Sequence, residues 1–78
     1  MKRRINVSTD YGSIEIVNLK RVWINEFLNT YRLMYEDDIY EYNCIYWSDI
    51  VPEKFSYFNE LKQKLINAYN SGIAIVEL

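Results

Sequence analysis

The sequence contains one cysteine, Cys44, and no histidine in a chain of 78 residues. A lone cysteine cannot form an internal disulfide, so the chain is not a small disulfide-stabilised scaffold. Without histidine it cannot build a His-based catalytic triad, a His metal site or a His pH switch. A hydrophobic core must therefore stabilise the fold, and half of the residues are apolar. The length predicts a single compact domain over residues 1–78, with a basic N-terminal arm at 1–4.

Two short alternating segments near the N-terminus predict a β-hairpin. Ile5 and Val7 alternate with polar residues, which is the period of a half-buried strand. The segment Asp10–Ser13 then supplies residues that are typical of turns. Ile14 and Ile16 share one face of the segment that follows, so it is predicted to be the second strand of the hairpin.

Large side chains recur every three to four positions after Asn18, which is an acceptable helix N-cap. They are Trp23, Phe27, Tyr31 and Met34 or Tyr35. This spacing predicts a helix over residues 19–36. Val22 and Ile24 also alternate with polar residues, so an alternative prediction extends the second strand to about Ile24.

The segment Ile39–Trp47 is dominated by aromatic and β-branched residues, which gives it the strongest strand signal in the chain. Four of its side chains would share one face of the strand, and these are Tyr40, Tyr42, Cys44 and Tyr46.

The last third of the chain predicts a second helix and a final strand. Pro52 suits the first turn of a helix, and Gly72 suits the residue that ends it. The apolar face of this helix is marked by Phe55, Phe58, Leu61, Leu65 and Ala68 or Tyr69. The apolar run Ile73–Val76 then predicts a strand near the middle of a sheet, covered on both faces.

The predicted order of elements is therefore β-β-α-β-α-β. It indicates a small single sheet of about four strands with two helices, an α/β fold of α+β-like character.

The middle of the chain is acidic and rich in aromatic residues. Residues 36–53 contain six acidic side chains and no basic one, although the net charge of the chain is only −2. Acidic groups can steer the encounter with a basic partner surface, and Tyr and Trp can anchor it. We therefore predict a partner-binding surface made of Glu36, Asp37, Asp38, Tyr40, Glu41, Tyr42 and Asp49. A solvated loop followed by a core strand would explain the same residues without a binding role.

This surface predicts a small non-enzymatic module that binds another protein with a basic surface. The small size and the acidic-aromatic segment also suit a phage or mobile-element inhibitor. Such an inhibitor would cover a host defence or nucleic-acid-processing protein, acting as a nucleic-acid mimic. A homodimer is a third use of exposed aromatic side chains, because an open sheet edge can pair with itself.

The alternative function is that of a small nucleic-acid-binding or regulatory protein. Basic side chains would contact phosphates while exposed aromatic side chains stack on bases. The candidate residues are Lys2, Arg3, Arg4, Lys20 and Arg21. The negative net charge argues against this function.

The sequence offers little that could carry out catalysis. The adjacent carboxylates Glu36–Asp38 do not converge readily on a cation, and Cys44 has no neighbouring base. Gly12 and Gly72 stand apart from any phosphate-binding loop. We therefore expect no enzymatic activity, no metal and no cofactor. The sequence shows neither a signal-peptide pattern nor a long apolar run, which predicts a cytoplasmic protein without membrane association.

Overall fold

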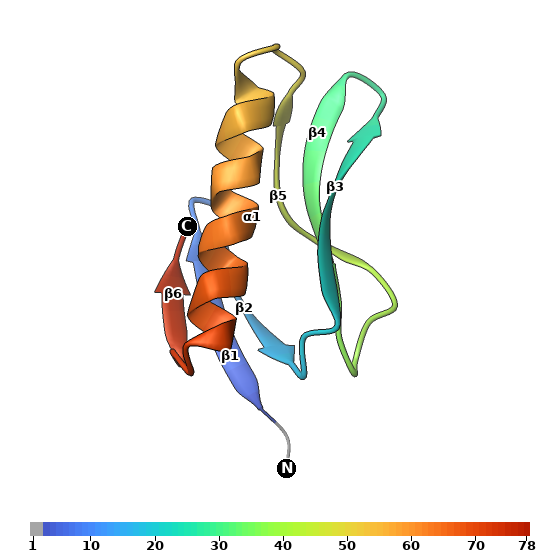
Figure 1. Cartoon of the computed structure of the whole chain (residues 1–78). Coiled ribbons are helices and arrows are strands. Elements are labelled where there is room, and N and C mark those ends of the chain that lie inside the picture. The colour runs from blue at the N-terminus through green and yellow to red at the C-terminus, as the bar shows by residue number, and fades with distance from the viewer. Residues whose placement is uncertain (1–2) are drawn as a thin grey trace.

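The computed structural model describes residues 3–78, which form six strands and one helix (Figure 1). In chain order they are β1 (Arg4–Thr9), β2 (Gly12–Val17), β3 (Arg21–Phe27), β4 (Thr30–Glu36), β5 (Asn43–Asp49), α1 (Lys54–Asn70) and β6 (Ile75–Glu77). The strands form two three-stranded sheets, with the orders β2-β1-β6 and β3-β4-β5. The predicted single sheet of four strands with two helices is therefore wrong, although the fold is α+β-like.

The first sheet confirms the predicted N-terminal hairpin and corrects the position of the last strand. β1 pairs antiparallel with β2 and parallel with β6, so β1 lies in the centre. The prediction that the apolar C-terminal strand occupies the middle of a sheet is wrong. β6 is an edge strand of three residues, in which Val76 is buried while Ile75 is 72% exposed. An edge strand this short brings only one side chain to the core.

The second sheet replaces the helix that was predicted over residues 19–36. β3 and β4 form an antiparallel hairpin in which Phe27 lies opposite Thr30. The two loop residues, Leu28 and Asn29, have φ angles of 47° and 53°. Positive φ at both central residues is what a type I′ turn requires, and this turn matches the twist of the two strands.

The aromatic spacing was misleading because it combined the two faces of this hairpin. Tyr31 and Tyr35 are buried against α1, whereas Trp23 and Phe27 lie on the opposite face of the sheet. The alternation of Val22 and Ile24 was the correct signal, but it belongs to a separate strand. Asn18, with a φ of 55°, provides the bend that divides that strand from β2.

β5 begins later than the sequence predicted. The strand spans Asn43–Asp49 rather than residues 39–47, and Tyr40 and Tyr42 lie in the loop that precedes it. The register between β4 and β5 shifts at Leu33/Met34, so Ile45 has no direct partner on β4.

The predicted C-terminal helix is confirmed as α1. Its buried residues are Phe58, Leu61, Leu65 and Ala68. The helix ends as the sequence predicts, because Gly72 adopts a φ of 77°. The Gly72 amide donates to the Tyr69 carbonyl oxygen (3.2 Å) and the Ile73 amide to the Ala68 carbonyl oxygen (3.0 Å), which together make a Schellman motif.

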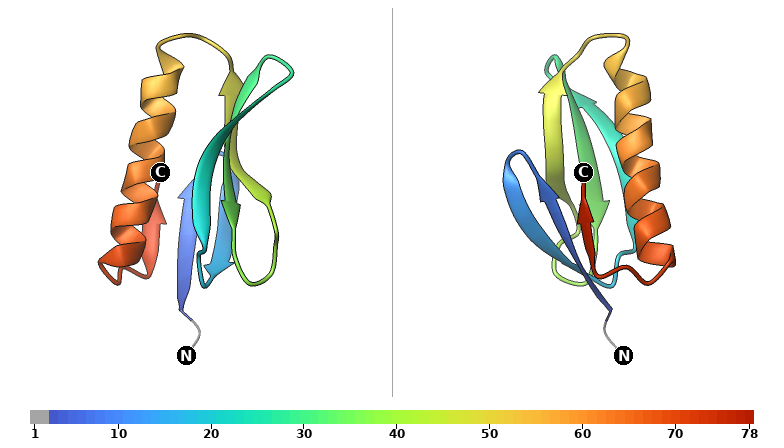
Figure 2. Two further views of the ribbon diagram at one scale, coloured as in Figure 1. Left: turned by 45° about the vertical axis from the view of Figure 1, so that its right-hand side comes forward. Right: turned by 90° about the vertical axis from the view of Figure 1, so that its left-hand side faces the viewer.

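The core lies between α1 and the inner faces of both sheets. Figure 2 shows α1 on one side of the molecule and the strands of β1 to β5 on the other. All six strands and the helix contribute side chains to this core. The core residues are Ile5, Val7, Ile16, Val22, Tyr31, Leu33, Tyr35, Ile45, Phe58, Leu61, Leu65, Ala68 and Val76. The outer face of β3 and β4 is therefore left uncovered by the helix.

Candidate functional site

The loop of residues 37–42, between β4 and β5, is organised by the carboxylate of Asp37. Its Oδ2 accepts a hydrogen bond from the Val17 amide (2.9 Å), and its Oδ1 accepts from the amides of Ile39 (2.9 Å) and Tyr40 (2.8 Å). The Asp37 side chain thereby joins the end of β2 to the end of β4. Asp37 is only 3% exposed, so its carboxylate is enclosed and does not contribute to a contact surface.

The environment of Asp37 favours the ionised carboxylate. Burial by itself raises the pKa, because it removes water from the charged form. The hydrogen bonds from the Val17, Tyr40 and Ile39 amides, with a smaller contribution from Lys20, outweigh burial and hold the pKa of Asp37 below its usual range. Asp37 is therefore a charged structural residue at the junction of the two sheets.

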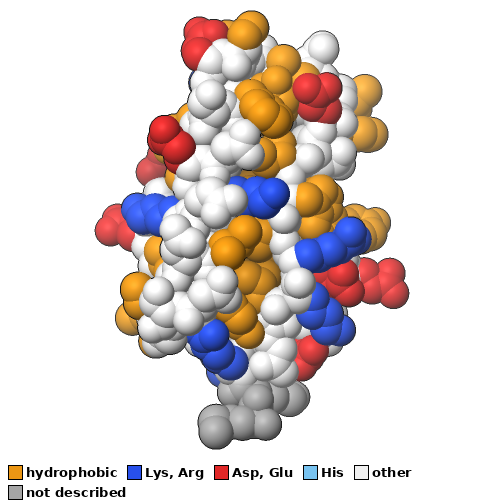
Figure 3. All heavy atoms as spheres, viewed as in Figure 1, with side chains coloured by type: hydrophobic (Ala, Val, Ile, Leu, Met, Phe, Trp, Pro, Cys, Tyr) orange, Lys and Arg blue, Asp and Glu red, His pale blue; other side chains and the backbone are white. Residues whose placement is uncertain are grey.

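The two neighbouring carboxylates form ion pairs within the chain. Glu36 Oε1 lies 2.9 Å from Arg21 Nε, and Asp38 Oδ1 lies 3.8 Å from Lys20 Nζ. Asp38 Oδ2 also accepts a hydrogen bond from Asn18 Nδ2 (2.6 Å). Figure 3 shows basic and acidic side chains next to one another along this flank of the molecule.

The rest of the predicted acidic-aromatic surface is divided between two ends of the molecule. Tyr40 and Tyr42 are 48% and 69% exposed, and the exposed Glu41 forms no ion pair within residues 3–78. Asp49 is the last residue of β5, opposite Thr30. Six steps of extended chain separate it from Asn43, which is roughly 20 Å. The structure thus brings Tyr40, Glu41 and Tyr42 together and places Asp49 elsewhere.

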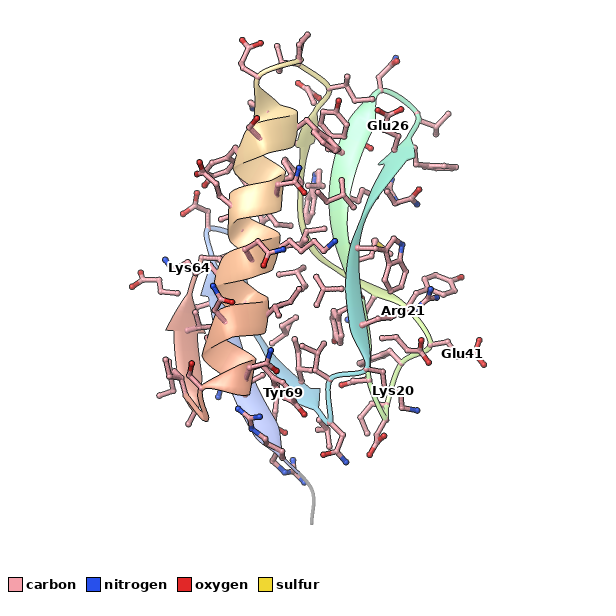
Figure 4. All side chains as sticks on the ribbon, in the orientation of Figure 1. Lys20, Arg21, Glu26, Glu41, Lys64 and Tyr69 are labelled. Atoms are coloured by element: carbon pink, nitrogen blue, oxygen red, sulfur yellow. The ribbon has the colours of Figure 1, made fainter. Side chains whose placement is uncertain are left out.

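The basic residues of the nucleic-acid alternative do not form one patch in the described part of the chain. Lys2 lies outside the described residues. The Arg3 guanidinium lies over the Tyr69 ring at 4.0 Å, and Arg4 pairs with Glu15 at 2.6 Å. Lys20 and Arg21 form the ion pairs given above, and in Figure 4 they lie on the same flank as Glu41.

The structure reveals a surface that the sequence analysis missed, on the outer face of the β3–β4 hairpin. We call it the arginine–aromatic face, and it consists of Arg21, Trp23, Asn25, Phe27, Arg32, Met34 and Tyr42. These side chains surround a shallow hollow of about 430 Å³. The signal that could have found them is the period-two alternation of residues 21–27, which the predicted helix obscured.

The two arginines of this face lie on aromatic rings. The Arg21 guanidinium carbon is 4.2 Å from the centre of the Trp23 ring, and that of Arg32 is 4.9 Å from the Phe27 ring. Such cation–π contacts hold a long side chain in a defined position. Arg21 is also paired with Glu36, whereas Arg32 forms no ion pair within residues 3–78. The face therefore presents one uncompensated positive charge between exposed rings.

A smaller cavity of about 160 Å³ lies between the β1–β2 hairpin and β5. Tyr11 reaches across its mouth, where its ring stacks on Trp47 at 4.0 Å and its hydroxyl donates to the Trp47 carbonyl oxygen (3.0 Å). The thiol of Cys44 lines this cavity, and burial raises its pKa. The thiol is thus held in its neutral form, which is a poor nucleophile.

Nothing in the described residues resembles a metal site, since no group of three Cys, Asp or Glu side chains converges there. Within the same residues no helix is long and apolar enough to cross a membrane. Comparison of the chain with protein-family models, with curated proteins and with solved structures finds no match.

Proposed function

We propose that this chain is a binding module that holds another protein at the arginine–aromatic face. The observation that carries the proposal is the pair of guanidinium groups lying on the rings of Trp23 and Phe27, at 4.2 Å and 4.9 Å, around one hollow. The residue types of this face are those that dominate binding energy in protein interfaces, where Trp, Tyr, Arg, Phe and Met are enriched.

The exposure of these side chains supports a contact role. Phe27 is 50% exposed and Tyr42 is 69% exposed, and Trp23 is half-buried. None of the three is needed to fill the core, which lies on the opposite face of the sheet. Large apolar side chains that the fold does not bury itself are characteristic of interaction sites.

The charge balance favours a protein over a nucleic acid as the partner. The face and its rim carry equal numbers of basic and acidic side chains, namely Lys20, Arg21 and Arg32 against Glu36, Asp38 and Glu41. A surface that binds a polyanion needs an excess of positive charge, because phosphate contacts supply most of the affinity. A nearly neutral surface with aromatic anchors suits a folded protein partner instead.

The acidic-aromatic loop belongs to this proposal as the rim of the face. Tyr42 lines the hollow, and Glu36 neutralises Arg21. A partner seated on the face would therefore contact Glu41 and Tyr40 as well. Inhibition of a host protein by a phage or mobile-element protein is the finer form of the proposal, and it rests on the small size of the chain.

Site-specific photocrosslinking in cells of the source organism tests the proposal. A photoreactive phenylalanine derivative replaces Asn25, at the centre of the face, and in a matched control it replaces the exposed Glu60 on α1. We expect one protein adduct at position 25 that survives nuclease treatment and is absent from position 60. A nucleic-acid adduct at position 25, or the same adduct at both positions, contradicts the proposal.

A charge reversal makes the test residue-specific. Arg32→Glu should reduce the yield of the position-25 adduct at least tenfold, because it places a carboxylate beside the aromatic rings. Lys64→Glu on α1 changes the net charge equally and should leave the yield unchanged. An unaltered yield for Arg32→Glu in a folded protein would exclude this face as the contact surface.

A further inference from the structure

The strand β3 has the longest regular open edge among the described residues. The two sheets have four edge strands, which are β2, β6, β3 and β5. β6 contains three residues, and β5 is interrupted by the register shift. β2 faces the junction with the second sheet, where Val17 is hydrogen-bonded to Asp37 and Asp38.

β3 spans seven residues that pair with β4 in one unbroken register and include no proline. Natural edge strands are usually shortened, bulged or covered, because an open edge is a template for another strand.

The hydrogen-bonding pattern shows which groups of β3 face this edge. The Ile50 amide donates a hydrogen bond to the Asn29 carbonyl oxygen (3.0 Å). In this register the odd-numbered residues at the start of β4 direct their backbone N–H and C=O groups toward β5. The even-numbered residues of β4 then bond to β3, since antiparallel pairs alternate in this way. On β3 the backbone N–H and C=O groups of Val22, Ile24 and Glu26 are therefore directed away from β4.

We propose that β3 pairs antiparallel with β3 of a second copy of this chain, so that two copies share one continuous six-stranded sheet. The pairing is centred on Ile24, which lies opposite Ile24 of the second copy. In this register Val22 lies opposite Glu26, and all three edge residues exchange backbone hydrogen bonds. A two-fold axis through this pair makes the interface the same for both copies.

The charges at the two ends of β3 support a second copy as the occupant. Figure 4 shows Glu26 and Lys20 at opposite ends of the strand. In an antiparallel copy, Glu26 of one chain lies at the same end of the shared edge as Lys20 of the other chain, so an acidic and a basic side chain come near one another at each end. Glu26 forms no ion pair within residues 3–78, and Lys20 contacts Asp38 only at 3.8 Å. The dimer would therefore contain two such ion pairs.

Apolar and aromatic side chains follow the same two-fold arrangement. Figure 3 shows hydrophobic side chains gathered between α1 and β3. The side chain of Ile24 in β3 is half-buried and packs against the core, and Ile24 of the second copy would cover more of it. On the outer face, Arg21 would lie opposite Phe27 of the other chain, so the two arginine–aromatic faces would join into one surface. The pairing does not depend on the proposed function, because the backbone hydrogen bonds that define it come from the edge of β3, namely from Val22, Ile24 and Glu26.

Sedimentation velocity of the full chain between 5 µM and 1 mM tests the inference. One strand pair buries less than a standard interface, so we expect a dissociation constant on the order of 10–100 µM. A chain of this length can be made by chemical synthesis with a methyl group on the backbone nitrogen of Ile24. This change removes one edge donor and leaves the side chain and the β3–β4 bonds intact, and it should raise the dissociation constant at least tenfold.

Two controls separate the proposed pairing from other kinds of association. The same methyl group on Glu15, an exposed residue of the edge strand β2, should leave dimerisation unchanged. Glu26→Lys should weaken the dimer, and Glu26→Lys combined with Lys20→Glu should restore it. The proposal is overturned if the unmodified chain stays monomeric at 1 mM, or if the folded Ile24 derivative dimerises as tightly as the parent. A double charge swap that fails to restore the dimer contradicts the antiparallel register.

Discussion

The junction between the two sheets and the arginine–aromatic face use their polar groups in opposite ways. At the junction, the carboxylate of Asp37 is enclosed and accepts three backbone hydrogen bonds, and Asp38 is held by Asn18 and Lys20. On the face, Arg32 rests on an exposed ring and forms no ion pair within residues 3–78. The most acidic part of the chain is thus largely occupied by its own fold, whereas the open surface is aromatic.

This difference shows that local composition does not reveal which charges a partner can reach. A carboxylate that accepts hydrogen bonds from several backbone N–H groups stabilises the loop around it. The same carboxylate is then no longer available to bind a partner. An aromatic side chain on an uncovered sheet face has no such internal role. Substitutions at the junction should therefore change stability, while those on the face should mainly change binding.

The largest expected effect follows from removal of the Asp37 carboxylate. Asp37→Ala leaves the Val17, Ile39 and Tyr40 amides without their acceptor, so we expect a loss of about 2–4 kcal/mol in the free energy of unfolding. Urea unfolding followed by circular dichroism measures the loss. Glu41→Ala, in the same loop but without an ion pair in the described residues, is the control and should change stability by less than about 0.5 kcal/mol. Equal effects of the two substitutions would remove the distinction between junction and surface.

The pH dependence of stability should identify the same carboxylate. Because the backbone hydrogen bonds of the folded state hold the pKa of Asp37 below that of an aspartate in the unfolded chain, ionised Asp37 stabilises the fold at pH values above the unfolded-state pKa. This contribution should be lost as the pH falls from about 4 through the lower pKa of the folded state. Urea midpoints at pH 2 to 7 should show this acid-side decrease. In Asp37→Asn the decrease should be smaller, and an identical slope in both proteins would contradict the role of Asp37.

The sequence predicted the elements whose residues follow one period over their whole length. In α1, Phe58, Leu61 and Leu65 keep the helical spacing, and Gly72 ends the helix. In the N-terminal hairpin, Ile5 and Val7 keep the alternation of a strand. Both elements were therefore predicted correctly from local pattern alone.

The predicted helix over residues 19–36 was wrong because a tight turn lies within it. Aromatic residues from the two faces of the β3–β4 hairpin happened to follow a helical spacing. Leu28 is a residue that no turn preference favours, yet it adopts a positive φ at the turn between β3 and β4. The first turn position therefore gave no sign of a hairpin, and Trp23, Phe27 and Tyr31 could be placed on one helical stripe in spite of the alternation of Val22 and Ile24. The same error explains why the sequence did not predict the arginine–aromatic face, because the residues of this face lie together only when the two strands are paired. The role of Asp37 depends on Val17, twenty positions earlier, which no local pattern contains.

The turn between β3 and β4, in the hairpin that carries the arginine–aromatic face, can be changed to a more favourable sequence, which should stabilise the folded chain. Leu28 is 76% exposed, so its side chain adds little packing to offset the left-handed backbone conformation. Replacing Leu28-Asn29 by Asn-Gly, which a type I′ turn favours, should raise the free energy of unfolding by about 1 kcal/mol. Leu28→Ala keeps a non-glycine residue at the same φ and should give no comparable gain. Thermal and urea unfolding of the three proteins decide between these outcomes.

The smallest effect is expected for the contact between Arg32 and Phe27. At an exposed site a cation–π pair contributes about 0.5–1 kcal/mol, so Arg32→Ala should cost no more than that in the free energy of unfolding. A double-mutant cycle with Phe27→Leu isolates the contribution of the pair. A coupling energy near zero would mean that the guanidinium does not rest on the ring in solution. A measurable coupling would mean that Arg32 is positioned before the partner arrives, so that less side-chain entropy is lost on binding. In that case Arg32→Ala should weaken binding at the face by more than it weakens the fold, which is the reverse of what Asp37→Ala should do at the junction.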